Sequence, residues 1–132
     1  MAYSIEHIRI LRDEIRMCGL SVPEGFEDET DEALAAAYNG IGPDAWCAFF
    51  RELTTWLLGF FEAVALIHDC EYSAPNKSYR AFTAANLRFA YNAVRSAVLR
   101  TPGRQAAKVA GCGLLLALLC QLFGYKGYKC VK

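Results

Sequence analysis

The sequence predicts an all-α protein, and three observations support this class. Apolar residues recur at three- and four-residue spacing through most of the 132 residues, which is the period of one helix face. Residues that typically cap helices, Ser4 and Thr30, stand before two of these stretches. Turn-forming residues separate others, at residues 73–76 and 101–103. With 55% hydrophobic residues and no internal repeat, residues 1–132 are predicted to form a single helical domain with a buried core.

Two helices are expected in the first third of the chain. The first begins after Ser4 and ends at Gly19, and its apolar face is formed by Ile5, Ile8, Leu11, Ile15 and Cys18. Residues 22–29 are acidic and turn-prone, and they should form a loop. Thr30 then caps a short helix over residues 31–37, whose two leading carboxylates suit the positive end of the helix dipole.

A long apolar stretch follows Pro43, and it ends in polar residues. Residues 46–65 carry apolar side chains at helical spacing, and His68 and Tyr72 continue the same stripe, so both should face inward. We expect the stretch to divide into two helices near Gly59, because glycine weakens a helix interior.

The next helix is expected over residues 77–99. One of its faces carries Tyr79, Phe82, Asn86, Phe89 and Ala93. Burying an unpaired amide costs a few kcal/mol, so Asn86 needs a partner, and the imidazole of His68 is the obvious one. We therefore expect two long antiparallel helices that bring His68 and Asn86 within hydrogen-bond reach.

A C-terminal helix is expected over residues 106–123, with an uninterrupted apolar run at residues 109–120. A run of that length is too short for a bilayer, which needs about 20 residues. A buried core helix is the favoured interpretation, and a membrane-surface or partner-facing helix is the alternative. The tail, residues 124–132, is interpreted either as a flexible basic and aromatic end suited to lipid headgroups or as an ordinary frayed terminus.

Charge is distributed unevenly along the chain, although the net charge is zero. All 14 acidic residues lie at or before Glu71, whereas ten of the 14 Lys and Arg residues lie from Lys77 onward. One interpretation is that the two halves neutralise each other when the helices pack. The other is that the basic half meets a phospholipid membrane surface with anionic headgroups. Nucleic acid is not expected as a partner, because no recognised binding motif accompanies the basic residues.

Six cysteines, at positions 18, 47, 70, 112, 120 and 130, form no CxxC pair and no Cys/His cluster that would indicate zinc. We expect them to be mostly reduced, buried thiols. The first residues lack the basic and apolar regions of a secretory signal. A protein that stays in a cytoplasm is therefore expected, with peripheral attachment to a membrane as an option.

Three short segments suggest a hydrolytic site. Tyr38-Asn39-Gly40-Ile41-Gly42 alternates residues whose carbonyls can turn toward one point, because glycine tolerates the dihedral angles of a tight loop. Such a loop can hold a hard cation. His68 and Asp69 supply a base and a carboxylate side by side, about 100° apart around a helix. The structural alternatives are an ordinary turn before Pro43, a core histidine and a surface carboxylate.

These segments resemble the phospholipase A2 superfamily over residues 38–89. That family has a Y-x-G-x-G calcium loop, an H-D-x-x-Y helix motif and an A-D-x-x-F motif, and this chain has Tyr38 to Gly42, His68-Asp69-Cys70-Glu71-Tyr72 and Ala85-Asn86-Leu87-Arg88-Phe89. The resemblance is strongest to the minimal, disulfide-poor domains of viral capsid, phage and prophage proteins. One residue departs from the pattern, because Asn86 stands where the family has aspartate.

The resemblance implies calcium-dependent hydrolysis of the sn-2 ester of membrane phospholipids. Ca²⁺ would be bound by the carbonyls of Tyr38, Gly40 and Gly42 and by the Asp69 carboxylate, and it would polarise the ester carbonyl. The backbone N–H of Gly40 would add a donor to the oxyanion.

The resemblance also assigns the proton transfer. His68 would act as general base toward water, and Asn86 and Tyr72 would orient its ring. An amide cannot offset the charge of an imidazolium, so activity at this site is open. The alternative is a non-catalytic, phospholipase-like helical module that acts as a virion structural protein or binds a host protein.

Overall fold

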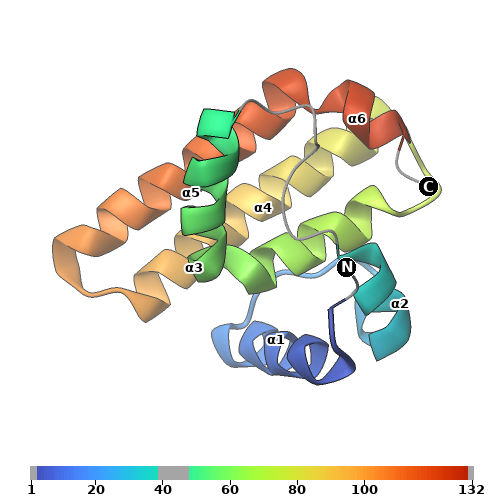
Figure 1. The fold of residues 1–132 in the computed structure, drawn as a ribbon, viewed down its shortest axis with the longest axis horizontal. Coiled ribbons are helices and arrows are strands. Elements are labelled where there is room, and N and C mark those ends of the chain that lie inside the picture. The colour runs from blue at the N-terminus through green and yellow to red at the C-terminus, as the bar shows by residue number, and fades with distance from the viewer. Residues whose placement is uncertain (1–2, 39–47, 131–132) are drawn as a thin grey trace.

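The computed structural model describes residues 3–38 and 48–130, with residues 48–59 described by their backbone alone. The elements in this part of the chain are α1 (Ile5–Cys18), a short 3₁₀ helix η1 (Phe26–Asp28), α2 (Asp31–Ala37), α3 (Ala48–Tyr72), α4 (Tyr79–Arg100), α5 (Gly103–Phe123) and α6 (Tyr125–Cys130). No strand occurs among the described residues. The all-α prediction is confirmed (Figure 1).

Local capping sets the ends of the first two α-helices, as predicted. The Ser4 hydroxyl accepts a hydrogen bond from the backbone N–H of His7 at 3.1 Å, and the Thr30 hydroxyl accepts one from Ala33 at 3.0 Å. Gly19 ends α1 with a φ of 58°, a left-handed conformation that glycine adopts without steric cost. These boundaries follow from nearest-neighbour chemistry, which explains why the sequence predicts them.

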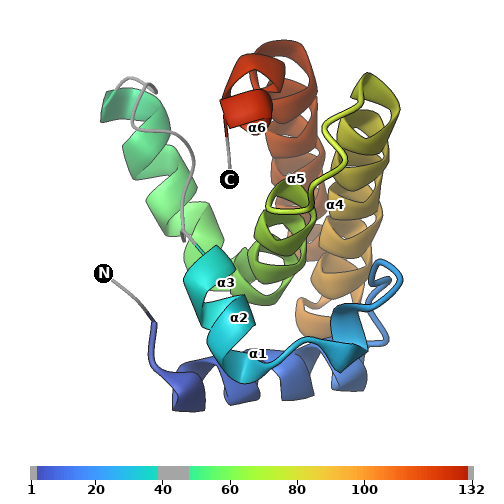
Figure 2. The same cartoon turned by 90° about the vertical axis from the view of Figure 1, so that its right-hand side faces the viewer.

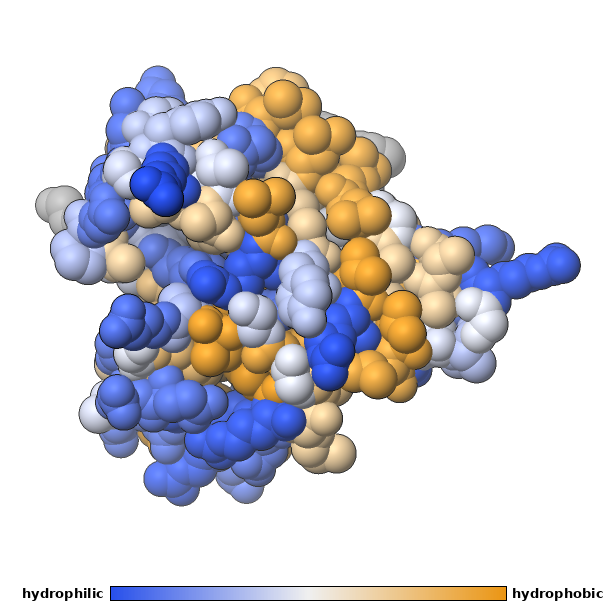
Figure 3. Space-filling model, turned by 180° about the vertical axis from the view of Figure 1, so that it is seen from behind, coloured by the Kyte–Doolittle hydropathy of each residue, from blue (hydrophilic) through white to orange (hydrophobic). Residues whose placement is uncertain are grey.

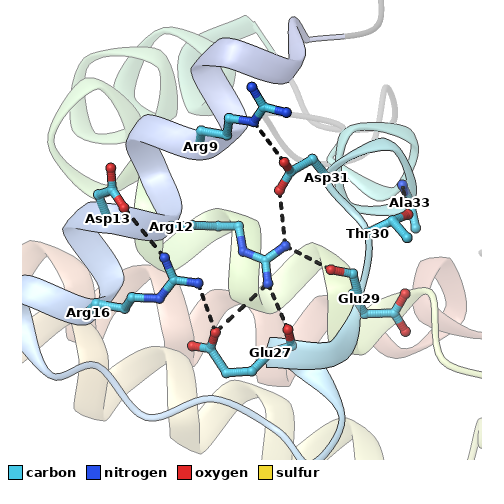
Figure 4. A network of polar contacts seen from close by, with 9 residues as sticks. All are labelled: Arg9, Arg12, Asp13, Arg16, Glu27, Glu29, Thr30, Asp31 and Ala33. Carbon is cyan, nitrogen blue, oxygen red and sulfur yellow. Dashed lines mark hydrogen bonds and ion pairs between the residues drawn. The ribbon is translucent and has the colours of Figure 1, made fainter.

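Arg12 fastens α1 to the segment that precedes α2 (Figure 4). Its guanidinium donates to the backbone carbonyls of Glu27 and Glu29, at 2.9 and 2.7 Å, and to the Asp31 carboxylate at 3.0 Å. Arg9 donates to the same carboxylate, and this hydrogen bond lowers the pKa of Asp31. The loop at residues 22–29 is therefore held in place by a side chain whose role the sequence pattern does not reveal.

Helix α3 bends within its length, and its two parts point in different directions (Figure 2). The non-helical residue is Phe61, with φ −106° and ψ 24°, so the expected division near Gly59 is displaced by two residues. The part after the bend is deeply buried, with Phe61, Val64, Leu66 and Ile67 each at most 1% exposed. This part packs beside α4 and carries His68.

Helix α5 packs along α4, but most of its surface is exposed, which corrects the expectation of a buried core helix. Its buried residues are Gly113, Leu116 and Ala117, whereas Leu114, Leu115, Leu118 and Leu122 are 47–62% exposed. The reason is that one face meets α4 and Phe61, while no described element covers the other face. By length and composition alone, α5 could cross a membrane.

The C-terminal residues up to Cys130 form helix α6, so the tail is neither flexible nor frayed as far as that residue. Tyr128 is 1% exposed, and its hydroxyl donates to the backbone carbonyl of Asn76 at 2.5 Å. Its ring packs edge-on against Tyr72, with 4.9 Å between ring centroids. The C-terminal helix α6 thus packs an aromatic side chain directly against Tyr72, a residue of the H-D-x-x-Y motif.

Two glycines of α5 provide a matched test of how closely it packs on α4. A Cβ at Gly113 would lie 2.5 Å from the Cβ of Ala93 and 3.2 Å from Phe61, whereas a Cβ at Gly111 meets nothing within 4 Å. Gly113→Ala is expected to lower the free energy of unfolding by about 1–3 kcal/mol, because both backbones must move apart. Gly111→Ala is expected to raise it by up to about 1 kcal/mol through helix propensity. Urea unfolding of both variants checks this; equal effects would contradict the close approach.

Candidate functional site

His68 and Asn86 meet between α3 and α4, as the two apolar stripes predict. The Nε2 atom of His68 lies 2.8 Å from the Oδ1 atom of Asn86. Both side chains are buried, at 8% and 3% exposed, and the ring of Phe89 packs edge-on against the imidazole. Their burial follows from helical spacing, because each continues the face that carries the core residues of its helix.

Both the oxygen and the nitrogen of the Asn86 side-chain amide form hydrogen bonds, and these bonds define the tautomer of the His68 imidazole. Its Oδ1 atom also accepts a hydrogen bond from the Tyr72 hydroxyl at 2.8 Å, and its Nδ2 donates to Oε1 of Gln121 at 2.8 Å. Because Oδ1 can only accept, His68 must donate to it through Nε2–H. The lone pair of the neutral imidazole is then on Nδ1.

Gln121 of α5 also belongs to the site, although no motif in the sequence indicates it. Its Nε2 donates to the hydroxyls of Tyr79 and Thr83, both at 3.0 Å. These bonds fix the amide that orients Asn86. They also connect the buried pair to the surface, because Tyr79 is 55% exposed although it shares a helix face with Asn86. The available signal was a single polar residue beside the apolar run of residues 109–120.

Burial lowers the pKa of His68 to about 4, against the smaller raising effect of its hydrogen bond with Asn86. The imidazole is therefore neutral at pH 7 and can accept a proton on Nδ1. Among the described residues, no carboxylate takes the place of Asn86 to stabilise the protonated ring. The geometry thus resembles a base held in position, but its electrostatic support is weaker than an aspartate would supply.

The depressed pKa predicts that stability falls as the pH is lowered. An unfolded histidine titrates near 6.5, so protons favour the unfolded chain below that pH until the folded pKa of about 4 is reached. We expect the free energy of unfolding to lose about 2–3 kcal/mol between pH 7.5 and pH 4.5 through this group. Urea unfolding with EDTA present should show that His68→Gln removes this part of the loss. His7→Gln is the control and should retain the loss of stability at low pH. The same pH dependence of stability in both variants would contradict the assignment of this loss to His68.

Only part of the proposed calcium loop can be located. Tyr38 is 3% exposed and stacks on Tyr3, with 4.4 Å between ring centroids. Burial raises its pKa, and the charges of Glu62 and Asp69 add to this, so the start of the loop lies in the neighbourhood of Asp69. Gly40 and Gly42 lie outside the described residues. Within the described ranges, no group of three His, Cys, Asp or Glu side chains is placed to hold a metal ion.

A cavity of about 530 Å³ lies apart from the His68 pair, between α2, η1 and the turn from α3 to α4. Phe26, Leu34, Cys70 and Glu71 are among its lining residues, whereas His68 and Asn86 are not. Glu71 pairs with Arg88 through Oε1, and its buried Oε2 has no partner among the described residues. Burial raises the pKa of this carboxyl.

The five cysteines that the structure describes are free. Four are half-buried and Cys130 is exposed, so the expectation of buried thiols is wrong for Cys130 and only partly met elsewhere. Burial raises the pKa of Cys70 to about 11 and that of Cys120 to about 12. Both thiols stay protonated at neutral pH, which argues against either as a nucleophile.

Comparison with models of protein families, with curated proteins and with solved structures found no match to this chain. The likeness to phospholipase A2 therefore depends on the three sequence motifs and on the hydrogen bonds that join His68, Tyr72 and Asn86.

Proposed function

We propose that this protein hydrolyses the sn-2 ester of membrane phospholipids in a calcium-dependent reaction. One observation carries the proposal: the Asn86 amide oxygen accepts hydrogen bonds from both His68 and Tyr72, each at 2.8 Å. Three residues from two separate motifs thus converge in the arrangement that the resemblance implies. The proposal also includes two structural features of that family: α3 and α4 would be antiparallel, and the glycine loop before them would bind calcium.

The side chains would carry out the proton transfer. Asn86 holds Nε2–H of His68, so Nδ1 is the ring atom that would take a proton from the attacking water. The Tyr72 hydroxyl donates to Asn86 and not to the base, which makes Tyr72 a positioning residue. Gln121 holds the other end of the Asn86 amide and prevents it from turning.

The cation would be held by hard oxygen ligands. The carbonyls of Tyr38, Gly40 and Gly42 and the carboxylate of Asp69 would supply them, and such ligands are those that Ca²⁺ prefers. When bound, Ca²⁺ would supply positive charge for the lipid phosphate and the developing oxyanion. The backbone N–H of Gly40 would be a second donor to that oxyanion. The position of Asp69 near Tyr38 is consistent with this set.

Fatty-acid release from mixed phospholipid vesicles tests the proposal directly. We expect release at millimolar Ca²⁺, loss of release with a calcium-specific chelator, and little release with Mg²⁺, which demands a tighter octahedral site. Asp69→Asn should weaken Ca²⁺ binding in calorimetry and reduce release in parallel. Absence of both Ca²⁺ binding and release would reject the enzyme.

The second candidate is a non-catalytic phospholipase-like module of a virion or of a bacterial host, which would bind a virion or host protein. Its specific support is the uncharged Asn86, together with the low pKa of His68. In that case the hydrogen bonds among His68, Asn86 and Gln121 would serve stability alone. The protein would act in the bacterial cytoplasm or in the virion under either candidate function.

A further inference from the structure

We propose that the exposed face of α5 docks the protein onto an anionic lipid bilayer, with the helix lying on the membrane surface. The choice of lipid rests on the proposed function, because a phospholipid hydrolase must reach a bilayer. The surface itself is defined by exposed leucines and by uncompensated basic residues. Hydrophobic side chains gather on the side of the molecule opposite to the view of Figure 1 (Figure 3).

The leucine face of α5 consists of Leu114, Leu115, Leu118 and Leu122, which are 47%, 49%, 52% and 62% exposed. At 100° per residue, these four positions fall within about a third of the helix circumference. Phe123 extends the face at its end and is 73% exposed. Large contiguous apolar surface of this kind marks a site of interaction, since water does not favour it.

Basic residues flank the leucine face along the chain. Arg104 and Lys108 lie on the same side of α5 as the leucines, about two to three turns before Leu114. Lys126 and Lys129 follow on α6. All four are exposed, and none forms an ion pair with a residue that the structure describes. Because no acidic residue follows Glu71, this half of the chain carries no compensating carboxylate.

That charge pattern favours an anionic bilayer over a second copy of the chain. An apolar helix face with flanking Lys and Arg inserts its leucines at the headgroup level and places its cations against lipid phosphates. A symmetric dimer through the same face would instead bring two uncompensated basic surfaces together, and like charges repel. Only two ion pairs among described residues, Arg88 with Glu71 and Arg100 with Glu14, join the basic half to the acidic half.

The fold is preserved if α5 lies on the surface of the bilayer, but not if α5 spans it. The inner face of α5 contains Gly113, which lies against Ala93 and Phe61, and Gln121, which binds Asn86. Transfer of α5 into a bilayer would break these contacts and leave the Asn86 amide without its partner, which is costly.

Vesicle sedimentation tests the docking surface separately from hydrolysis. The protein carries His68→Gln and calcium is chelated, so no lipid is consumed. We expect binding to vesicles of phosphatidylcholine with phosphatidylglycerol, and at least tenfold weaker binding to phosphatidylcholine alone. Leu118→Glu should weaken binding to the anionic vesicles at least tenfold, whereas the matched control Ile10→Glu, at a 58% exposed position on α1, should not. Both changes are at exposed positions, and circular dichroism confirms their folding.

Several outcomes would overturn the docking surface. One is equal vesicle binding by Leu118→Glu and Ile10→Glu. Another is a dimer in light scattering that Leu118→Glu dissociates while no vesicle binding occurs, which would assign the face to a second copy. Hydrolysis of a short-chain phospholipid dispersed as monomers tests the reaction alone. Monomer hydrolysis without vesicle binding rejects only this surface, and vesicle binding without any hydrolysis rejects only the proposed reaction.

Discussion

His68→Gln is expected to reduce fatty-acid release to the level of the uncatalysed control. The glutamine amide can still donate a hydrogen bond toward Asn86, so the buried contact is kept, but it cannot accept a proton at neutral pH. General base catalysis typically contributes about 10²–10⁴-fold, and the loss should fall in or above that range. Initial rates on mixed vesicles at millimolar Ca²⁺ provide the measurement.

His7→Gln is the matched control for this change. His7 is the other of the two histidines in the chain, and it is half-buried on α1. Its Nε2 contacts Glu62 at 3.3 Å, away from Asn86. We expect its turnover to stay within about twofold of the unaltered protein, as for a residue outside the site. Turnover that survives His68→Gln would remove His68 from the role of base, and with it the mechanism proposed above.

Asn86→Asp is expected to increase turnover. The new carboxylate would lie 2.8 Å from Nε2 of His68 and would stabilise the imidazolium that forms on proton abstraction, raising the pKa of His68 from about 4. In a serine protease, the reverse change, in which asparagine replaces the catalytic aspartate, lowers turnover by about 10⁴-fold. We therefore expect a gain of at least tenfold, with about 10⁴ as an upper bound.

The surrounding hydrogen bonds can accept a carboxylate at this position. Tyr72 already donates to the oxygen that would remain. Gln121 now accepts from Asn86 through Oε1, but a half-turn of its amide would present Nε2–H instead. Its present partners, Tyr79 and Thr83, are hydroxyls that can donate as well as accept, so the turned amide keeps its hydrogen bonds.

Two measurements decide the outcome of Asn86→Asp. NMR titration of the His68 ring should show its pKa rising, and vesicle assays should show faster release. Adding Tyr72→Phe to the same protein should reverse part of the gain, because the buried carboxylate loses a donor. A risen pKa without any gain in turnover would place the defect outside the pair and favour the non-catalytic module.

Several features of this protein were determined by the sequence alone, because they depend on short-range interactions. The hydroxyls of Ser4 and Thr30 reach backbone donors three residues away, and Gly19 adopts a left-handed conformation that costs glycine no steric strain. The meeting of His68 and Asn86 also follows from sequence, since each continues a regular apolar stripe and a buried amide requires a partner.

The tertiary structure decided what local spacing cannot specify. Gln121 joins the site from a helix 35 residues away along the chain from Asn86, and no periodic pattern pairs such positions. The sequence shows that α5 is apolar, but its exposure depends on which elements cover it, and in the described part only one face is covered. The pKa of His68 likewise reflects burial by the assembled helices, because desolvation is a property of the surroundings of a side chain and not of the side chain itself.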